Sequence, residues 1–427
     1  MSQPLRTGRA PASVFVIAVC VVLALGIAGT GHPDDPPPHV VFVTSVNGTG
    51  DLGSWPEAQI GTSGVDAGDS ICQNQATIAG LANPLDFVAW LSDSDDDAYC
   101  RVHGVTGKVS NNCDGATLVA AGPWVRTDGH PFAPTIDRLL SPTNEVYTPL
   151  KYDENGQAVS AVLFTGTSGT GGAGSELCTD GGTLTDWASS TGAGRVGTTH
   201  ETGSKWTYAL IGLCSSGSRL ICIEKGQGGP LPPFAQVGKL AFVTSVSGTG
   251  ELSAWPEADA GTSGIAAGDS ICRNLATAAG LPVPDSFRAW LSDSTTDAKD
   301  RFVLPGPWVR VDGVVVFPSP ADLATFNLFT ALNLTETGAY LATGRAWTGT
   351  GHSGTAASER CSEWLDGTTG SQGLLGYCTS TTSGWTTNVS RSCDQEYRLY
   401  CLALDNGIFA DGFESGDPTG WSTWVPQ

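Results

Sequence analysis

The sequence is poor in positive charge. It contains 21 Lys and Arg residues against 42 Asp and Glu residues, which gives a formal net charge of −21. A surface this acidic repels the phosphate backbone of nucleic acids, so no nucleic-acid partner is expected. Long apolar runs are also missing after residue 29. No later stretch is therefore predicted to cross a membrane.

The N-terminus carries the one long apolar run. Two arginines precede an uncharged segment at 13–29, near whose end Gly26-Ile27-Ala28 supplies the small residues that a signal peptidase favours. This pattern is typical of a cleaved signal peptide, whereas an uncleaved membrane anchor, the alternative, is usually longer. We predict a signal peptide at 1–28 and a Pro-rich spacer at 29–38. The protein is then secreted or held at the cell surface, with no membrane span after cleavage.

The chain repeats itself. "DSICQNQATIAGL" begins at Asp69 and "DSICRNLATAAGL" at Asp269, and neighbouring phrases recur at the same offset of 200. The offset falls to 184 at "GPWVR", so the first copy carries a 16-residue insertion. Repeats this long are whole domains. The predicted organisation is domain 1 at 39–224, a Gly/Pro linker at 225–238, domain 2 at 239–404 and an acidic tail at 405–427, a possible sorting motif.

Each domain has the pattern of an α+β fold. The segment at 40–46 is β-branched and aromatic, which predicts a strand. The segment at 67–80 predicts a helix on which Cys72, Ala76 and Ala79 share a face, capped by Gly80. "WVRTDG" and "WVRVDG" predict hairpins, and many short strands and long loops follow.

The cysteines indicate disulfides. Of the 12 cysteines, Cys20 lies in the predicted signal peptide, and the others meet an oxidising environment after export. Four positions are shared between the domains and allow three pairings. Joining the first to the last closes the longest loop, which stabilises most, by about 4–5 kcal/mol. Cys100 and Cys113 lie in the insertion and are predicted to pair. Cys378 is left over, either buried, which we favour, or bonded to a second chain.

The order of these motifs resembles a known family. A strand, an "AGDSIC" helix, "AWLSDS", a "WTGT" segment and a terminal "RLYC" are similar to the endostatin domain of collagens, and more closely to exported bacterial endostatin-like domains, which have no established activity. The resemblance covers about 40–224 and 239–403. It implies two tandem, C-type-lectin-like domains with nested disulfides. The implied pairs are Cys72–Cys222, Cys178–Cys214, Cys272–Cys401 and Cys361–Cys393.

Several features of that superfamily are missing. The Glu-Pro-Asn, Gln-Pro-Asp and Trp-Asn-Asp tripeptides of calcium-dependent sugar binding do not occur, nor does the arginine cluster with which endostatin binds heparin. His32 and His39 have no counterparts in domain 2, so zinc is not expected. The acidic loop that begins at Asp93 lacks the glycine and the terminal glutamate of a calcium loop, and a solvated loop is favoured. We expect no metal and no cofactor.

The sequence favours a non-catalytic binding protein over an enzyme. Two domains on a linker would raise the avidity for an extracellular protein or glycan, and a monomer is expected. No histidine is shared between the domains, which excludes a histidine-based catalytic centre common to both. The alternatives are a carboxylate-dependent polysaccharide hydrolase and a structural component of an envelope or matrix. The predicted ligand-binding residues follow two shared motifs; they are Asp93, Asp97, Arg126, Asp128, Asp293, Asp297, Arg310 and Asp312.

Overall fold

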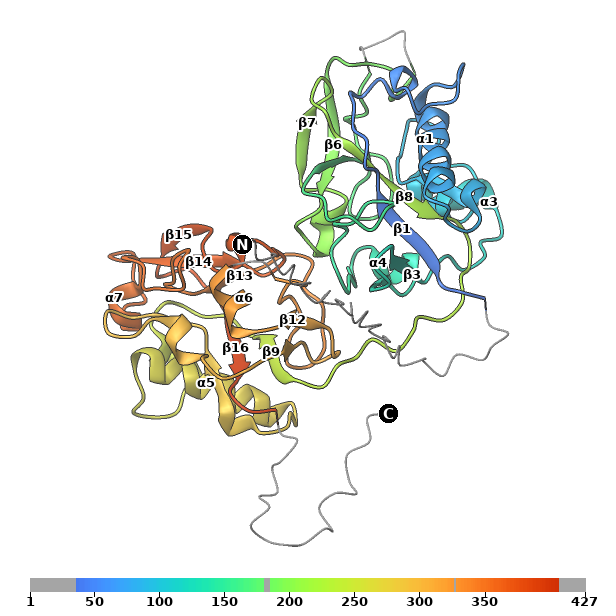
Figure 1. Cartoon of the computed structure of the whole chain (residues 1–427). Helices are drawn as coiled ribbons and strands as arrows, with labels where there is room; N and C mark the ends of the chain where they lie inside the picture. The colour runs from blue at the N-terminus through green and yellow to red at the C-terminus, as the bar shows by residue number, and fades with distance from the viewer. Residues whose placement is uncertain (1–35, 180–184, 326–327, 407–427) are drawn as a thin grey trace, which may run out of the picture.

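The chain forms two similar α+β domains (Figure 1). The computed structural model describes residues 36–179, 185–325 and 328–406. The predicted signal peptide and nearly all of the predicted tail lie outside the described residues. Domain 1 runs from strand β1 to strand β8, and domain 2 from β9 to β16.

The helices and strands of the two domains share the order of the strands and one long helix after the first strand, whereas some short helices differ. In domain 1 they are β1 (His39–Val43), α1 (Gly64–Ile78), β2 (Phe87–Ala89), α2 (Ala98–Val102), α3 (Asn112–Gly115), β3 (Trp124–Arg126), β4 (Pro131–Ala133), α4 (Ile136–Leu139), β5 (Val162–Phe164), β6 (Ala193–Thr198), β7 (Leu210–Leu213) and β8 (Arg219–Glu224). In domain 2 they are β9 (Lys239–Val243), α5 (Gly264–Ala278), β10 (Phe287–Ala289), β11 (Trp308–Val309), β12 (Val315–Phe317), α6 (Pro320–Thr325), β13 (Arg345–Trp347), α7 (Cys361–Trp364), β14 (Gln372–Tyr377), β15 (Val389–Ser392) and β16 (Arg398–Ala403).

Each domain is built on one mixed sheet. The strand order in domain 1 is β4-β3-β1-β8-β5-β6-β7, with β2 also paired to β8, and domain 2 repeats it as β12-β11-β9-β16-β13-β14-β15, with β10 on β16. The pairs β1–β3 and β5–β8 are parallel, and the other pairs of domain 1 are antiparallel. The expectation of two similar α+β domains is therefore confirmed.

The predictions made from short sequence patterns largely agree with the structure. Helix α1 buries Cys72 and Ala76 on one face, although Ala79 at its C-cap is only partly covered. Gly80 adopts a φ of 70° just beyond the helix, the left-handed conformation that favours glycine. The "WVRTDG" segment forms the β3–β4 hairpin, and its counterpart forms β11–β12.

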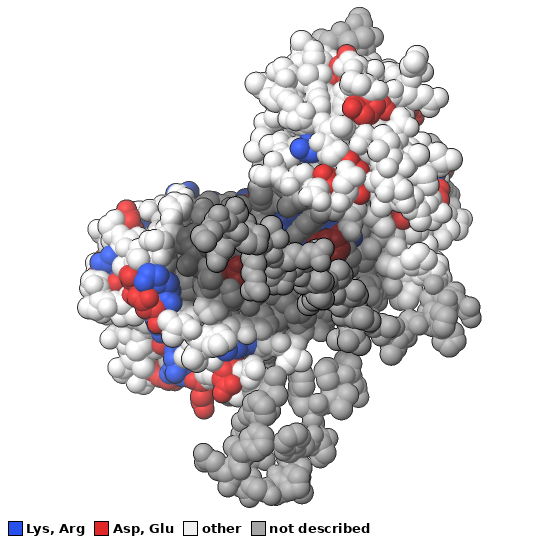
Figure 2. All heavy atoms as spheres, viewed as in Figure 1, with Lys and Arg blue, Asp and Glu red and all other residues white. Residues whose placement is uncertain are grey.

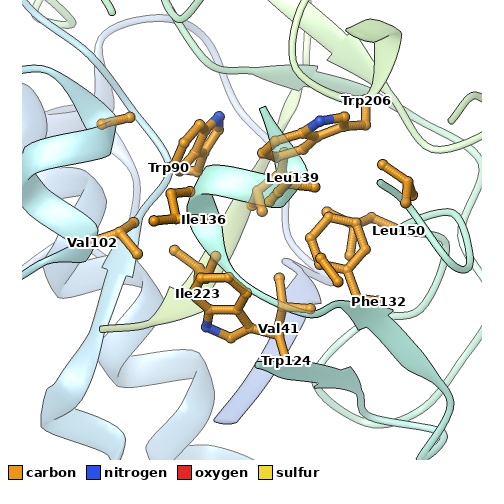
Figure 3. Close-up of a cluster of buried hydrophobic side chains, with 14 of the residues drawn as sticks. Val41, Trp90, Val102, Trp124, Phe132, Ile136, Leu139, Leu150, Trp206 and Ile223 are labelled. Carbon is orange, nitrogen blue, oxygen red and sulfur yellow. The ribbon is translucent and has the colours of Figure 1, made fainter. Parts of the chain in front are cut away.

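The sheet of each domain is buried on both faces. Alternate residues of a strand point to opposite faces, so Val41 and Val43 of β1 join one core while Phe42 joins the other. The second core lies under helix α1 and includes Ile71. The first core, shown in Figure 3, is rich in aromatic rings, among them Trp90, Trp124, Phe132 and Trp206.

Five disulfides tie the two domains internally. They are the pairs expected from the sequence and the resemblance: Cys72–Cys222, Cys100–Cys113, Cys178–Cys214, Cys272–Cys401 and Cys361–Cys393. The longest loops span 150 and 129 residues, so these bonds remove the most freedom from the unfolded chain. Five disulfides indicate an oxidising, extracellular type of environment. In the part of the chain that the structure describes, no helix has the length and apolar character of a membrane span.

Among the described residues, Cys378 is the free cysteine, and it is buried, as expected. It lies directly after β14, and its counterpart in domain 1 is Thr199. Burial raises the pKa of the Cys378 thiol to about 12, so the thiol is protonated and unreactive at neutral pH.

The two domains contact each other across an approximate two-fold axis. Thr202 N–H donates to the Thr379 carbonyl, and Thr381 N–H donates to the His200 carbonyl, each at 2.9 Å. Thr202 corresponds to Thr381, and His200 to Thr379, so the two hydrogen bonds are related by the internal repeat. Glu201 and Ser380, which also correspond, form the bridge between them.

A second pair of contacts obeys the same symmetry. Phe329 of domain 2 lies over the Arg126 guanidinium of domain 1, 5.4 Å from its carbon. Tyr147, the counterpart of Phe329, lies beside Arg310, whose Nη2 donates to the Tyr147 carbonyl at 3.3 Å. The Thr330 hydroxyl also donates to that carbonyl, at 2.6 Å. The domains therefore associate as the two subunits of a symmetric dimer do.

The linker lies against both domains. Gly228 N–H donates to the Gly122 carbonyl of domain 1, and Gln236 N–H donates to the Gly313 carbonyl of domain 2. The Phe234 ring contacts Tyr147 with ring centroids 4.8 Å apart. The Gly/Pro linker therefore packs against both domains.

We predict that the domains stay together without the linker. A protease site inserted after the exposed Pro232 allows the purified chain to be cut, and none of the disulfides in the described part of the chain joins the halves. The cut protein should elute in size-exclusion chromatography as the intact chain does, because the interface contacts remain. The double variant Tyr147→Ala, Phe329→Ala removes the two rings that contact the opposite domain, Tyr147 against Tyr340 and Phe329 against Arg126, and should separate after cutting. Separation of the otherwise unmodified cut chain would contradict the interface.

Candidate functional site

The aspartates predicted to contact a ligand hold loops in place. Asp97, which is 4% exposed, accepts hydrogen bonds from the backbone N–H groups of Val109 and Ala173, each at 2.7 Å, and from Lys108 Nζ at 3.3 Å. Its counterpart Asp297 accepts from Ala356 N–H at 2.7 Å. These carboxylates join the loop after β2 or β10 to a distant loop.

Asp93 and Asp293 close short turns. Asp93 accepts the N–H groups of the two residues at 95 and 96, and burial raises the pKa of its carboxyl. Asp293 accepts the N–H and hydroxyl of Thr295. Burial alone would raise the pKa of Asp293, but these hydrogen bonds lower it. Ligand contact by these aspartates stays a prediction.

The predicted arginine–aspartate pairs lie at the interface between the domains. Arg126 binds Asp128 through Nε at 3.0 Å and Nη2 at 2.6 Å, and Arg310 binds Asp312 through Nε at 3.2 Å and Nη2 at 2.8 Å. Both arginines are buried, at 1% and 0% exposure. Burial alone would raise the pKa of Asp128, but hydrogen bonds from His130 and Arg126 lower it well below its usual value. These pairs support the contact between the domains.

We predict that Asp97→Ala destabilises domain 1. The change removes the charged acceptor of two part-buried backbone N–H groups, and a hydrogen bond to a charged group contributes about 1.5–3 kcal/mol. Urea unfolding should show this loss, whereas Asp95→Ala, an exposed position in the same loop, should stay within about 0.5 kcal/mol of the unmodified protein. Equal stability of the two variants would show that Asp97 is free to serve a ligand.

A polar cavity of about 410 Å³ opens in domain 1 at the ends of β5, β6 and β8. This is within the usual size range of ligand pockets. None of its lining residues is acidic, although the chain as a whole is strongly acidic. Arg219 is the cationic residue in the lining, and its Nη1 donates to the Thr44 carbonyl at 2.5 Å. The lining residues are Asn47, Ser160, Ala161, Val162, Thr198, His200, Gly217 and Arg219.

Strand register brings a serine and a histidine together in this cavity. Antiparallel strands β5 and β6 pair Val162 with Thr198, so Ser160, two residues before Val162, lies opposite His200, two residues after Thr198. Ser160 Oγ is 2.6 Å from His200 Nε2. Burial, and then the charge of Lys151, lower the pKa of His200 below its ordinary 6.5. The imidazole is therefore mainly neutral at pH 7, and in the tautomer that carries its proton on Nδ1 the Nε2 atom accepts from the serine hydroxyl.

Domain 2 fills the corresponding place with its own side chains. The register of β13 and β14 pairs Arg345 with Tyr377 where domain 1 has Val162 and Thr198. The Arg345 guanidinium carbon lies 4.6 Å from the centroid of the Tyr377 ring, and Nη2 donates to the phenol oxygen at 3.1 Å. By the same register, two threonines stand where domain 1 has the serine and the histidine; they are Thr343 and Thr379. The domains share a backbone and differ at this site.

Sequence reasoning missed the cavity because it searched for residues that both domains share. Ser160, Val162 and His200 are unshared, and were therefore set aside. A comparison of the two copies that looked for differences at matched positions would have found them. A histidine-based catalytic centre common to both domains remains excluded, but a histidine-based site in domain 1 alone is not.

Comparison with known proteins adds no family assignment. No protein-family model matches the chain, and no curated protein matches it. Within the described residues, no three His, Cys, Asp or Glu side chains are grouped so as to hold a metal ion. The candidate site is therefore defined by the cavity of domain 1 and the side chains that line it.

Proposed function

We propose that this is an exported, extracellular binding protein in which domain 1 of a C-type-lectin-like pair carries the ligand pocket. Its ligand is a sugar residue that bears a carboxylate or a sulfate, at the end of an extracellular glycan. The observation that carries the proposal is a polar cavity with an arginine and no carboxylate in its lining. Arginine suits such anions because its guanidinium presents paired N–H donors.

The shape and composition of the cavity fit a single sugar unit. Hydroxyl and amide groups from Asn47, Ser160 and Thr198 are suited to hydrogen bonds with sugar hydroxyls, and Val162 offers an apolar wall that is 41% exposed. A few placed polar groups beside apolar surface are the usual composition of a small-ligand site.

Charge on the rest of the surface limits the ligand. Figure 2 shows acidic residues scattered over the visible faces of both domains, with few basic residues on domain 1. Such a surface repels a long polyanion but hardly affects a single anionic group that enters an acid-free cavity. A terminal acidic sugar therefore suits the protein better than a heparin-like chain.

The matched arginines of the two domains provide a test. Arg219 and Arg398 make the same backbone contact, to the carbonyls of Thr44 and Thr244, but only Arg219 lines the cavity. Isothermal titration with a glucuronate-terminated disaccharide should show binding that Arg219→Gln weakens about tenfold or more, because it loses a charge-assisted hydrogen bond. Arg398→Gln should leave affinity unchanged and alter the melting temperature to a similar extent.

A second variant closes the cavity without touching the arginine. The double change Val162→Arg, Thr198→Tyr copies the filled site of domain 2 and should abolish binding of the same disaccharide. A glucose-terminated disaccharide serves as the neutral control and should bind weakly to every form. Equal binding of both sugars, or binding that survives the closed cavity, would refute the pocket as the acidic-sugar site.

The alternative of a carboxylate-dependent polysaccharide hydrolase gains no support from this cavity. Such enzymes place two carboxyl groups about 5–10 Å apart around the scissile bond. The shared carboxylates Asp128 and Asp312 are held by arginines between the domains, and none lines the pocket.

A further inference from the structure

We infer that Ser160 and His200 form a nucleophile–base pair that hydrolyses carboxylic esters bound in the cavity of domain 1. This goes beyond the proposed binding function and does not depend on the identity of the sugar. Three observations carry it: the short contact between the two side chains, their position in the cavity, and the threonines that replace both of them at the matching place in domain 2.

The geometry suits activation of the serine. Ser160 Oγ lies 2.6 Å from His200 Nε2, within the range for a nucleophile and its general base. The serine is exposed to the cavity, while the histidine is half-buried at the end of β6. The backbone of His200 is fixed by the hydrogen bond from Thr381 N–H of domain 2. The contact between the domains therefore positions the base.

The reaction proceeds in two balanced steps. Ser160 Oγ attacks the ester carbonyl carbon while its proton passes to His200 Nε2, and the tetrahedral intermediate then expels the alcohol, which takes that proton. The acyl group is left on Ser160 as an ester. Water attacks this ester, gives its proton to His200 and releases the carboxylic acid, and the proton returns to Ser160 Oγ.

Donors for the negative oxygen stand in the same cavity. The guanidinium of Arg219 and the side-chain amide of Asn47 line it, and hydrogen-bond donors of this kind stabilise an oxyanion. No carboxylate in the lining orients the imidazole, so the site is a dyad. We therefore expect slow turnover of activated esters.

Active-site labelling and ester hydrolysis test this site in the full chain. A fluorophosphonate should form one P–O bond to Ser160 with loss of fluoride, and peptide mass spectrometry should find the adduct there alone. Hydrolysis of p-nitrophenyl acetate should fall about a hundredfold or more in Ser160→Ala and in His200→Gln, which is the usual contribution of a general base. Ser175→Ala, an exposed serine outside the lining, is the control and should keep both labelling and rate.

Each other outcome overturns the inference. The serine–histidine contact would prove to be structural in any of three cases: the probe does not label the wild-type protein, the adduct forms at another residue, or hydrolysis persists in Ser160→Ala. Ser160→Ala changes an exposed residue and should leave the melting temperature unaltered. A loss of activity in this variant would therefore report the loss of the nucleophile. Failure here leaves acidic-sugar binding untouched, because that is measured by titration with a ligand that contains no ester.

Discussion

The two backbone hydrogen bonds exchanged between the domains are the constraint on which the site depends. They join Thr202 to Thr379 and Thr381 to His200, and each bond is the image of the other under the internal repeat. Both ends of the exchange follow β6 and β14 directly, so the contact fixes the chain where these strands leave their sheets. His200 lies at this point, and its side chain faces the cavity. Separation of the domains would free the residue that completes the pocket wall.

The duplicated fold carries different side chains at the matching place in its two copies. The same sheet, helix and nested disulfides appear in both domains, so the backbone ends of β5–β6 and β13–β14 are equivalent. The difference comes from side-chain volume. Small residues at 162, 198 and 217 leave space in domain 1, whereas Arg345 and Tyr377 occupy it in domain 2. Domain 2 then contributes by fixing the position of domain 1. The backbones of the two domains are related by the internal symmetry, but the side chains at this site are not.

The fold was predictable because its signals are local or duplicated. The helix at 64–78, its glycine cap and the Asp-Gly hairpins follow from short patterns. The nested disulfides follow from the shared cysteines together with the family resemblance, and Cys100–Cys113 follows from its place in the insertion. The site was not predictable in the same way. Asp97 reads as an exposed loop residue in the sequence, but distant N–H groups from 109 and 173 surround it. Arg126 and Arg310 read as hairpin residues, but both side chains are buried and contact the opposite domain. Such placements depend on long-range packing, which periodicity and spacing do not encode.

The association also changes how the duplication bears on binding. Two independent domains on a flexible linker gain avidity because each brings a site to a repeated target. Here the linker lies against both domains. The buried Arg126 guanidinium packs against the Phe329 ring of domain 2, and the buried Arg310 donates to the Tyr147 carbonyl of domain 1. The two halves thus form one body, and the cavity of domain 1 lies beside the contact between them. The second domain then raises the affinity for a ligand through pre-organisation. A rigid wall around His200 and Ser160 loses less conformational freedom when a ligand binds. The duplicated helix, strand and cysteine pattern is therefore best understood as the scaffold of a single site.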